Sequence, residues 1–177
     1  MKVNKMVVVD SVETVVRDKY GNIKSRHVYP DDYGLLHKLL VKLGLKHNSI
    51  VSAGMAAVAG LILTDVGGTA FDYVAFGSNN TAVTVNDTAL GTEIKRKAGT
   101  GTRVTTTYAN DTAQLTATFS SADGLSGTST IWECGMFNAS TGGTMLFRQV
   151  YSTADTLNWD AGDTYQLTLK VQVKQGS

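Results

Sequence analysis

The chain has 177 residues, which is the length of one domain with an extension, and its 42% hydrophobic and 18% charged content is that of a folded protein. A net charge of +1 argues against a nucleic-acid binder, which would present a strongly basic surface. A single cysteine, Cys134, excludes an internal disulfide and a multi-cysteine metal site.

No part of the sequence has the pattern of a membrane span or a secretory signal. The longest apolar stretch, from Ile50 to Leu63, has 14 residues and is too short to cross a bilayer. The first residues lack a charged region followed by an apolar run and a cleavage site. We therefore expect a globular protein that is made in the cytosol and binds neither membrane nor nucleic acid.

Charge and threonine content divide the sequence into two parts. Residues 1–50 contain nine lysines and arginines against five aspartates and glutamates, a net charge of +4, and the remainder has a net charge of −3. Threonine, which suits half-exposed strands, is abundant only from Thr64 onward. The joint at Val66-Gly67-Gly68 predicts an N-terminal arm over residues 1–66 and a second domain over residues 67–177.

The arm is predicted to begin with a β-hairpin. Extended runs at Met6–Val9 and Ser11–Arg17 lead into the turn sequence Asp18-Lys19-Tyr20-Gly21-Asn22, and Ile23–Val28 is the returning strand. Gly21 is the residue in this turn that is free to take a positive φ. A small hairpin is the expected result.

One or two short helices are predicted to follow. Pro30 and two aspartates begin a helix over Tyr33–Leu45, with five leucines at helical spacing and lysines on another face. Asn48 or Ser49 is expected to cap a second helix that runs through Leu63. Small residues in this helix, such as Gly54, would let another backbone approach it closely.

From Phe71 the hydrophobic pattern changes to short alternating or apolar runs. Clusters of Gly, Asn, Asp and Ser separate these runs, a spacing that is typical of an antiparallel sandwich or barrel. The predicted strands are Phe71–Phe76, Arg103–Ala109, Gln114–Ser120, Ser126–Glu133, Thr144–Tyr151 and Tyr165–Val173. The last run alternates strictly, so one of its faces is expected to be core. The predicted fold is mainly β: a jelly-roll-like antiparallel β-sandwich with the N-terminal arm of hairpin and helices.

No group of residues has the spacing of a catalytic or metal site. Cys134 lies in an apolar run, where a buried structural cysteine is favoured over a nucleophile. The three histidines lie ten residues apart rather than at the spacing that pairs ligands on a helix. Asp160 and Asp163 bracket a glycine, and a turn is favoured there over a Ca²⁺ site.

Two further stretches have simpler interpretations than ligand binding. Gly99–Thr102 lacks the lysine and the following helix of a phosphate-binding loop, so a flexible hairpin loop is predicted. Lys95-Arg96-Lys97 has no nearby aromatic residues and predicts a solvated edge strand or loop. We expect no enzyme activity and no cofactor. A glycan-cleaving or peptidase domain is the least favoured class and would depend on a residue such as Glu133 or Asp163.

Several segments of the β-rich part resemble a recurring phage pattern. Phe71–Gly77 (FDYVAFG) and Asn86–Glu93 (NDTALGTE) carry its first part, and Ala117–Phe119, Glu133–Ala139 (ECGMFNA) and Gly142–Arg148 continue it. These segments are similar to those of small bacteriophage virion proteins, described as head decoration (cement) or tail-fibre-like proteins. The resemblance covers about residues 46–173 and implies a structural protein with no catalytic residues to transfer. Within it, Glu133 and Asn138 are expected to accept hydrogen bonds from backbone donors.

The resemblance implies a capsid decoration protein as the first functional hypothesis. Such a protein, expected here as a homotrimer on the capsid surface of the virion, would clamp neighbouring major capsid subunits from outside. The positively charged N-terminal part, residues 1–50, is the candidate for binding an acidic surface on the capsid. Its predicted partner-binding residues are Lys19, Lys24, Arg26, Lys38 and Lys42.

The alternative hypothesis is a tail-fibre or receptor-binding component of the phage tail. Its loops Gly77–Asn80, Gly99–Thr102 and Asp160–Asp163 would then recognise a host surface. These loops contain no aromatic residue on which a sugar could stack, although Trp159 adjoins the last of them. The sequence therefore favours decoration.

Overall fold

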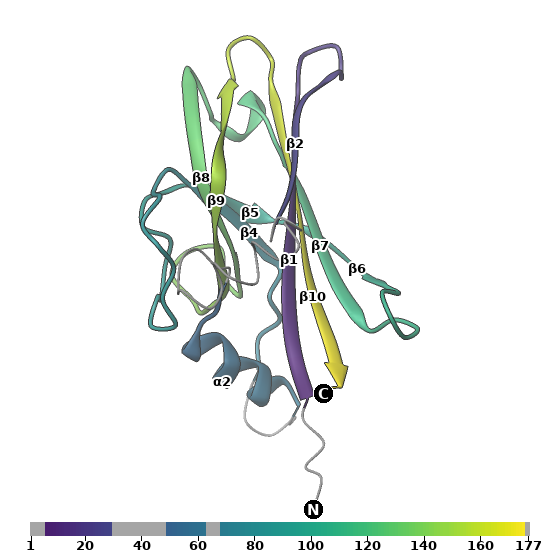
Figure 1. The fold of residues 1–177 in the computed structure, drawn as a ribbon. Helices are drawn as coiled ribbons and strands as arrows, with labels where there is room; N and C mark the ends of the chain where they lie inside the picture. Colours follow the sequence, from purple (N-terminus) through teal and green to yellow (C-terminus); the bar gives the residue numbers. More distant parts are fainter. Residues whose placement is uncertain (1–5, 30–48, 63–67, 176–177) are drawn as a thin grey trace, which may run out of the picture.

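Two antiparallel sheets pack face to face as a β-sandwich, which confirms the predicted fold class (Figure 1). The computed structural model describes residues 6–29, 49–62 and 68–175. Its elements in chain order are β1 (Met6–Arg17), β2 (Ile23–Tyr29), β3 (Ser49–Ile50), α2 (Ser52–Leu61), β4 (Tyr73–Gly77), β5 (Glu93–Ala98), β6 (Thr100–Val104), β7 (Thr112–Phe119), the 3-10 helix η1 (Ser121–Asp123), β8 (Thr128–Phe137), β9 (Met145–Asn158) and β10 (Thr164–Gln175). The helix expected over Tyr33–Leu45, which contains Lys38 and Lys42, lies outside the described residues.

The first sheet has the strand order β2-β1-β10-β7-β6. Its hairpin, β1 and β2 joined by a turn in which Gly21 has a φ of 85°, confirms the hairpin expected from the sequence. β1 also pairs with β10 along its whole length, from Met6 opposite Gln175 to Arg17 opposite Thr164. The hairpin therefore forms part of the sandwich itself. The boundary expected at residue 66 lies outside the described residues.

The second sheet has four main strands in the order β9-β8-β4-β5, and the two-residue β3 lies beside β9. The cluster Lys95-Arg96-Lys97 is on the edge strand β5, as expected, but it is not fully solvated: the Arg96 side chain is 7% exposed and lies over the Phe137 ring. Gly99 carries the chain from β5 in this sheet to β6 in the other. A Cβ on Gly99 would lie 2.8 Å from the Leu115 side chain, so glycine is required for this crossing.

Two predictions for residues 99–109 are wrong. Thr100–Val104 is the strand β6 rather than a flexible loop, and the strand expected over Arg103–Ala109 ends at Val104. The reason is Asp111, whose carboxylate accepts hydrogen bonds from the backbone N–H groups of Thr106, Thr107 and Tyr108, each at 2.9 Å. These bonds fold residues 105–111 into a turn between β6 and β7.

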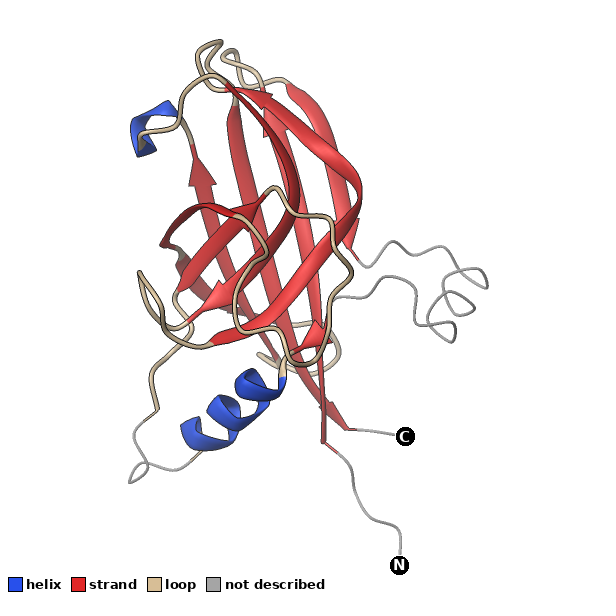
Figure 2. Cartoon of the chain, turned by 90° about the vertical axis from the view of Figure 1, so that its left-hand side faces the viewer, coloured by secondary structure: helices blue, strands red, loops and turns tan. Residues whose placement is uncertain are grey.

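Helix α2 confirms the second predicted helix but not its predicted start. Its N-cap is Val51, which makes no side-chain capping bond. Ser49, one of the two expected caps, lies instead in β3, where it is opposite Arg148 of β9 in the backbone pairing. The close approach expected at Gly54 is present, because a Cβ there would lie 2.3 Å from the Leu146 carbonyl oxygen. In the view of Figure 2, α2 lies below the sandwich and η1 lies near its other end.

The core lies between the two sheets and contains most of the aromatic side chains. The Phe76 ring meets Phe119 edge-on at 4.8 Å and Tyr165 edge-on at 5.5 Å, both between ring centroids. In β10, Tyr165, Leu167, Leu169 and Val171 face this core as predicted. Val173, expected on the same face, is 46% exposed because it lies near the end of the strand.

Candidate functional site

Two rigid turns form one end of the sandwich, which we call the tip: residues 18–22 between β1 and β2, and residues 159–163 between β9 and β10. In the first turn, Asp18 Oδ1 accepts hydrogen bonds from the backbone N–H groups of Tyr20 and Asn22, both at 2.9 Å. Asp18 Oδ2 accepts from the Asn22 side chain, also at 2.9 Å. These hydrogen bonds, of which the one from the Asn22 side chain is the strongest influence, lower the pKa of Asp18.

The second turn is held by side chains of the same kind. Asn158 Oδ1 accepts from Ala161 N at 3.1 Å, and Asp163 Oδ2 accepts from Asn158 N at 2.9 Å. Asp160 Oδ2 accepts from Gly127 N at 3.1 Å, which ties this turn to the segment before β8. The turn expected at Asp160–Asp163 is therefore present, and each carboxylate in it has a local structural partner.

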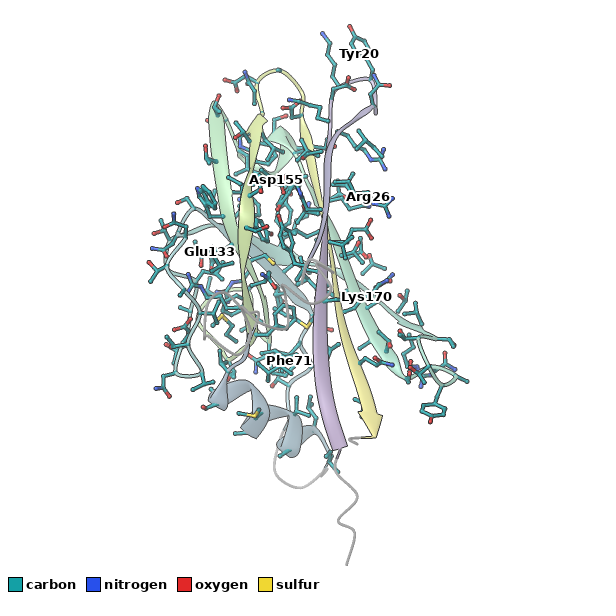
Figure 3. The ribbon with its side chains drawn as sticks, in the orientation of Figure 1. Tyr20, Arg26, Phe71, Glu133, Asp155 and Lys170 are labelled. Atoms are coloured by element: carbon teal, nitrogen blue, oxygen red, sulfur yellow. The ribbon has the colours of Figure 1, made fainter. Side chains whose placement is uncertain are left out.

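The two turns touch and enclose a shallow hollow of about 590 Å³. A Cβ on Gly162 would lie 2.9 Å from Lys19 Cβ, so the backbone of the second turn lies directly against the first. The hollow is lined by Asp18, Lys19, Tyr20, Lys24 and residues 160–163. Tyr20 is 79% exposed and projects from the end of the molecule (Figure 3). Trp159, by contrast, is buried and belongs to the core.

Of the five predicted partner-binding residues, the structure places Lys19, Lys24 and Arg26 on the β1–β2 hairpin. Lys24 forms an ion pair with Asp163 at 2.5 Å, and Arg26 Nε forms one with Glu13 at 2.6 Å. Lys19 lies over the Tyr20 ring, with Nζ 5.0 Å from the ring centroid. Two of these three cations thus already have a carboxylate partner within the chain, which lowers the net positive charge of the hairpin surface.

The residues that carry the phage-like pattern meet in a buried network inside the second sheet. Glu133 on β8 is fully buried and accepts hydrogen bonds from the backbone N–H groups of Asn79, Gly91 and Thr92 and from Arg148 Nε on β9. Arg148 Nη1 also donates to Asp87 Oδ2 at 2.9 Å. This network anchors the long segment between β4 and β5, which contains the NDTALGTE motif, to the sheet.

The structure confirms that Glu133 and Asn138 accept backbone hydrogen bonds, as expected from the sequence. Asn138 Oδ1 accepts from Thr144 N at 2.6 Å across the turn between β8 and β9. The pKa of Asp87 is lowered: partial burial raises it, but hydrogen bonds from Thr84 and Arg148 outweigh that effect. Glu133 lies within β8 rather than at a strand end, and no sequence motif indicates that Arg148 is its partner.

A second buried polar cluster joins the two sheets around Asp155 on β9. Asp155 Oδ1 accepts a hydrogen bond from Ser25 Oγ at 2.8 Å and lies 3.3 Å from His27 Nε2. Tyr165 OH donates to Asp155 Oδ2 at 3.3 Å, and its oxygen lies 2.9 Å from the Tyr151 hydroxyl oxygen. Sequence reasoning missed this cluster, since these residues are far apart in the chain and none belongs to a motif.

The Asp155 cluster does not have the geometry of a catalytic triad. Ser25 and His27 both approach the same carboxylate oxygen, whereas a serine nucleophile needs the histidine between itself and the acid. Burial raises the pKa of the Tyr151 and Tyr165 hydroxyls well above their usual range, and Cys134 adds to the effect. Cys134 itself is fully buried, as its apolar sequence context suggests.

At the opposite end from the tip, an apolar groove of about 660 Å³ opens between the sheets and α2. Its lining includes Val58, Phe71, Leu115, Met136 and Leu146. In Figure 3, Phe71 lies just above the helix. The two ends of the sandwich therefore differ in chemistry, one being polar and charged and the other aliphatic.

Comparison with known proteins gives no match: no family model, curated protein or solved structure is similar to this chain. Within residues 6–29, 49–62 and 68–175, no three His, Cys, Asp or Glu side chains are grouped to hold a metal ion. None of the helices in the described part of the chain has the length and hydropathy needed to cross a bilayer.

Proposed function

We propose that this chain is a non-enzymatic structural protein of a bacteriophage particle. In this proposal it binds the outer surface of the head as a decoration protein and clamps neighbouring major capsid subunits, as a homotrimer. Such a role requires a rigid module with an adhesive surface and no reaction chemistry. Its contacts would be individually modest and repeated over the shell, each near the ~1,000 Å² that specific interfaces bury.

The main support is where the phage-like residues lie. Asp87, Gly91, Thr92, Glu133 and Arg148 come from three of the segments that carry the resemblance, and they meet in one hydrogen-bonded network. Glu133 and Arg148 are 0% and 3% exposed, so they are placed to hold the fold rather than to reach a substrate. The residues of the phage-like segments thus form a hydrogen-bonded framework that stabilises the fold, as a structural protein would require.

The outer face of the β1–β2 hairpin is the surface that this proposal assigns to the capsid. Arg26 is the best placed of the predicted cations, because its side chain is 61% exposed and uses only Nε toward Glu13. Neither of its Nη groups has a hydrogen-bond partner among residues 6–29, 49–62 and 68–175, so both can bind a carboxylate on another molecule. Figure 3 shows Arg26 on the side of the hairpin, below the tip.

The location of the protein on the parent virus particle is the primary test. Cryo-electron microscopy of intact virions should show density for this sandwich repeated over the capsid lattice. Density confined to the tail would overturn the assignment to the head.

A binding experiment then tests the assigned surface. Purified protein should bind saturably to empty heads stripped of it, and Arg26→Glu should weaken binding by about tenfold or more, as loss of an interfacial arginine does. Arg103→Glu is the matched control: this arginine is also exposed and also lies on an edge strand of the first sheet, β6. Equal losses for the two variants would refute a role specific to the hairpin.

The alternative, a tail-fibre or receptor-binding component, gains one observation from the structure. The loop Asp160–Asp163 contains no aromatic residue, but Tyr20 from the other turn of the tip lines the same hollow. Tail density in the virion, together with binding of the purified protein to host cells, would favour this alternative.

A further inference from the structure

The tip combines three properties that recognition sites share. It presents an exposed aromatic ring, it has hydrogen-bonding groups around a hollow, and both of its turns are already ordered. Tyr20 has the largest exposed fraction, 79%, among the exposed large hydrophobic side chains of the described residues. A single exposed tyrosine is common on protein surfaces, but this one lines a hollow that also holds hydrogen-bonding groups, which is the arrangement of a contact residue.

We propose that the tip binds a neutral carbohydrate, with one sugar ring stacked on Tyr20 and its hydroxyls bonded within the hollow. The site goes beyond the proposed function and would operate equally on a head or on a tail. A sugar has a face of C–H groups that packs on an aromatic ring and a rim of hydroxyls that donate and accept hydrogen bonds. The tip offers a partner for each.

The groups around the hollow suit hydroxyls. Asp160 uses Oδ2 to hold Gly127 N, which leaves Oδ1 to accept a hydrogen bond from a ligand. Lys19 Nζ lies over the Tyr20 ring, 5.0 Å from its centroid, so a sugar would stack on the other face of the ring or displace the Lys19 side chain, which can then donate to its hydroxyls. Ala161 and Gly162 line the hollow with small residues, so a ring can approach its floor.

Charge argues against the other ligand classes. The lining contains three aspartates, Asp18, Asp160 and Asp163, and two lysines, Lys19 and Lys24. A phosphate or other anion would meet this slight excess of negative charge without a cluster of cations to bind it. A purely apolar ligand would desolvate the carboxylates without replacing their hydrogen bonds. An uncharged polar ligand avoids both penalties.

The two turns are already held in place before a ligand binds, which lowers the entropy cost of binding. The hydrogen bonds from Tyr20 N and Asn22 N to Asp18, and from Asn158 N to Asp163, already hold the two turns in place. Binding would then order little beyond the Tyr20 ring and the Lys19 side chain, which limits the entropy lost. A site of this size with one stacking ring is expected to bind weakly, in the millimolar range.

The test is saturation-transfer NMR on the purified full-length chain with four disaccharides: lactose, maltose, cellobiose and diacetylchitobiose. At least one should bind, with the transfer strongest at its ring C–H protons. Tyr20→Ala should weaken that binding by about tenfold, and Tyr20→Phe, which retains the ring, should preserve most of it. Tyr108→Ala is the control, because Tyr108 is 64% exposed on a turn at a distance from the hollow.

Two results would overturn the proposal. One is the absence of binding by all four disaccharides at tens of millimolar. The other is an equal loss of binding in Tyr20→Ala and Tyr108→Ala, which would indicate adhesion to exposed tyrosine in general. Neither result depends on binding to heads, so failure here is distinguishable from failure of the decoration proposal.

Discussion

The Glu133 network and the β1–β2 hairpin both contain carboxylate–arginine pairs, but these pairs have different roles. Glu133 and Arg148 are buried, and their hydrogen bonds join the segment before β5 to β8 and β9. Arg26 and Glu13 pair at the same distance, 2.6 Å, but the Arg26 side chain is 61% exposed. Water competes with the exposed Arg26–Glu13 pair, whereas burial shields the Glu133–Arg148 pair from the solvent.

This difference separates charges that hold the fold from charges available to a partner. A buried pair is costly to form, and breaking it leaves an uncompensated charge in a medium of low dielectric. An exposed pair contributes little to stability and can exchange its partner for one on another molecule. We therefore expect substitutions in the network to change stability and substitutions in the hairpin to change binding.

Glu133→Ala should have the largest effect. It would leave the buried Arg148 with only the Asp87 carboxylate, and three backbone N–H groups without an acceptor, which should lower the free energy of unfolding by about 3–5 kcal/mol. Urea denaturation followed by circular dichroism measures this loss. Glu13→Ala on the hairpin is the control and should cost less than about 1 kcal/mol. A loss below 1 kcal/mol for Glu133→Ala would show that the buried network is not needed for stability.

Asp155→Ala should have an intermediate effect. Asp155 is buried between the sheets and accepts hydrogen bonds from Ser25 and Tyr165, so its removal should cost about 2 kcal/mol. Ser25→Ala removes only one of these bonds and should cost about half as much. The same urea denaturation compares the two variants, and an equal loss in both would argue against Asp155 as the centre of the cluster.

Acidification should destabilise the protein gradually through its structural carboxylates. Partial desolvation acts to raise the pKa of Asp111, but hydrogen bonds from Tyr108 N, the Gln172 side chain and two threonine N–H groups lower it far below its usual range. Because the pKa is lower in the folded chain, the unfolded chain takes up the proton first as pH falls. Stability present above about pH 4 is then lost as the pH decreases further.

Asp111→Asn should therefore reduce the slope of unfolding free energy against pH between about pH 4 and pH 2. Urea denaturation at pH 7, 4 and 3 gives this slope. Asp72→Asn, which removes an exposed carboxylate just before β4, serves as the control. An unchanged slope in Asp111→Asn would mean that other carboxylates govern acid unfolding.

Lys24→Ala should have a small effect on stability, about 1 kcal/mol. The Lys24 side chain is 44% exposed, and Asp163, although only 3% exposed, keeps the hydrogen bond from Asn158 N. Thermal denaturation should show a shift of a few degrees at most. A larger loss would show that Lys24 stabilises the fold as the network residues do, and that the hairpin charges are not reserved for binding.

The structure confirms the sequence predictions that depended on local pattern. The hairpin turn at residues 18–22 and the alternation in β10 follow from turn chemistry and period-two hydrophobicity, which act over a few residues. The strand expected over Arg103–Ala109 was wrong because Asp111, just beyond it, draws the backbone into a turn. In the candidate site, the turn at 159–163 was predictable, whereas its contact with Lys19 and Tyr20 was not.

The amino-acid sequence by itself determined that this chain forms an antiparallel β-sandwich with a hairpin near its start, since both depend on local periodicity and turn residues. Only the tertiary structure decided that β1 pairs with β10, that Arg148 meets Glu133, and that Tyr20 shares a hollow with the turn at 159–163. These contacts join residues between 15 and 169 positions apart in the chain. A local sequence pattern does not predict such pairs, because they form only when the strands assemble into sheets and the two sheets pack.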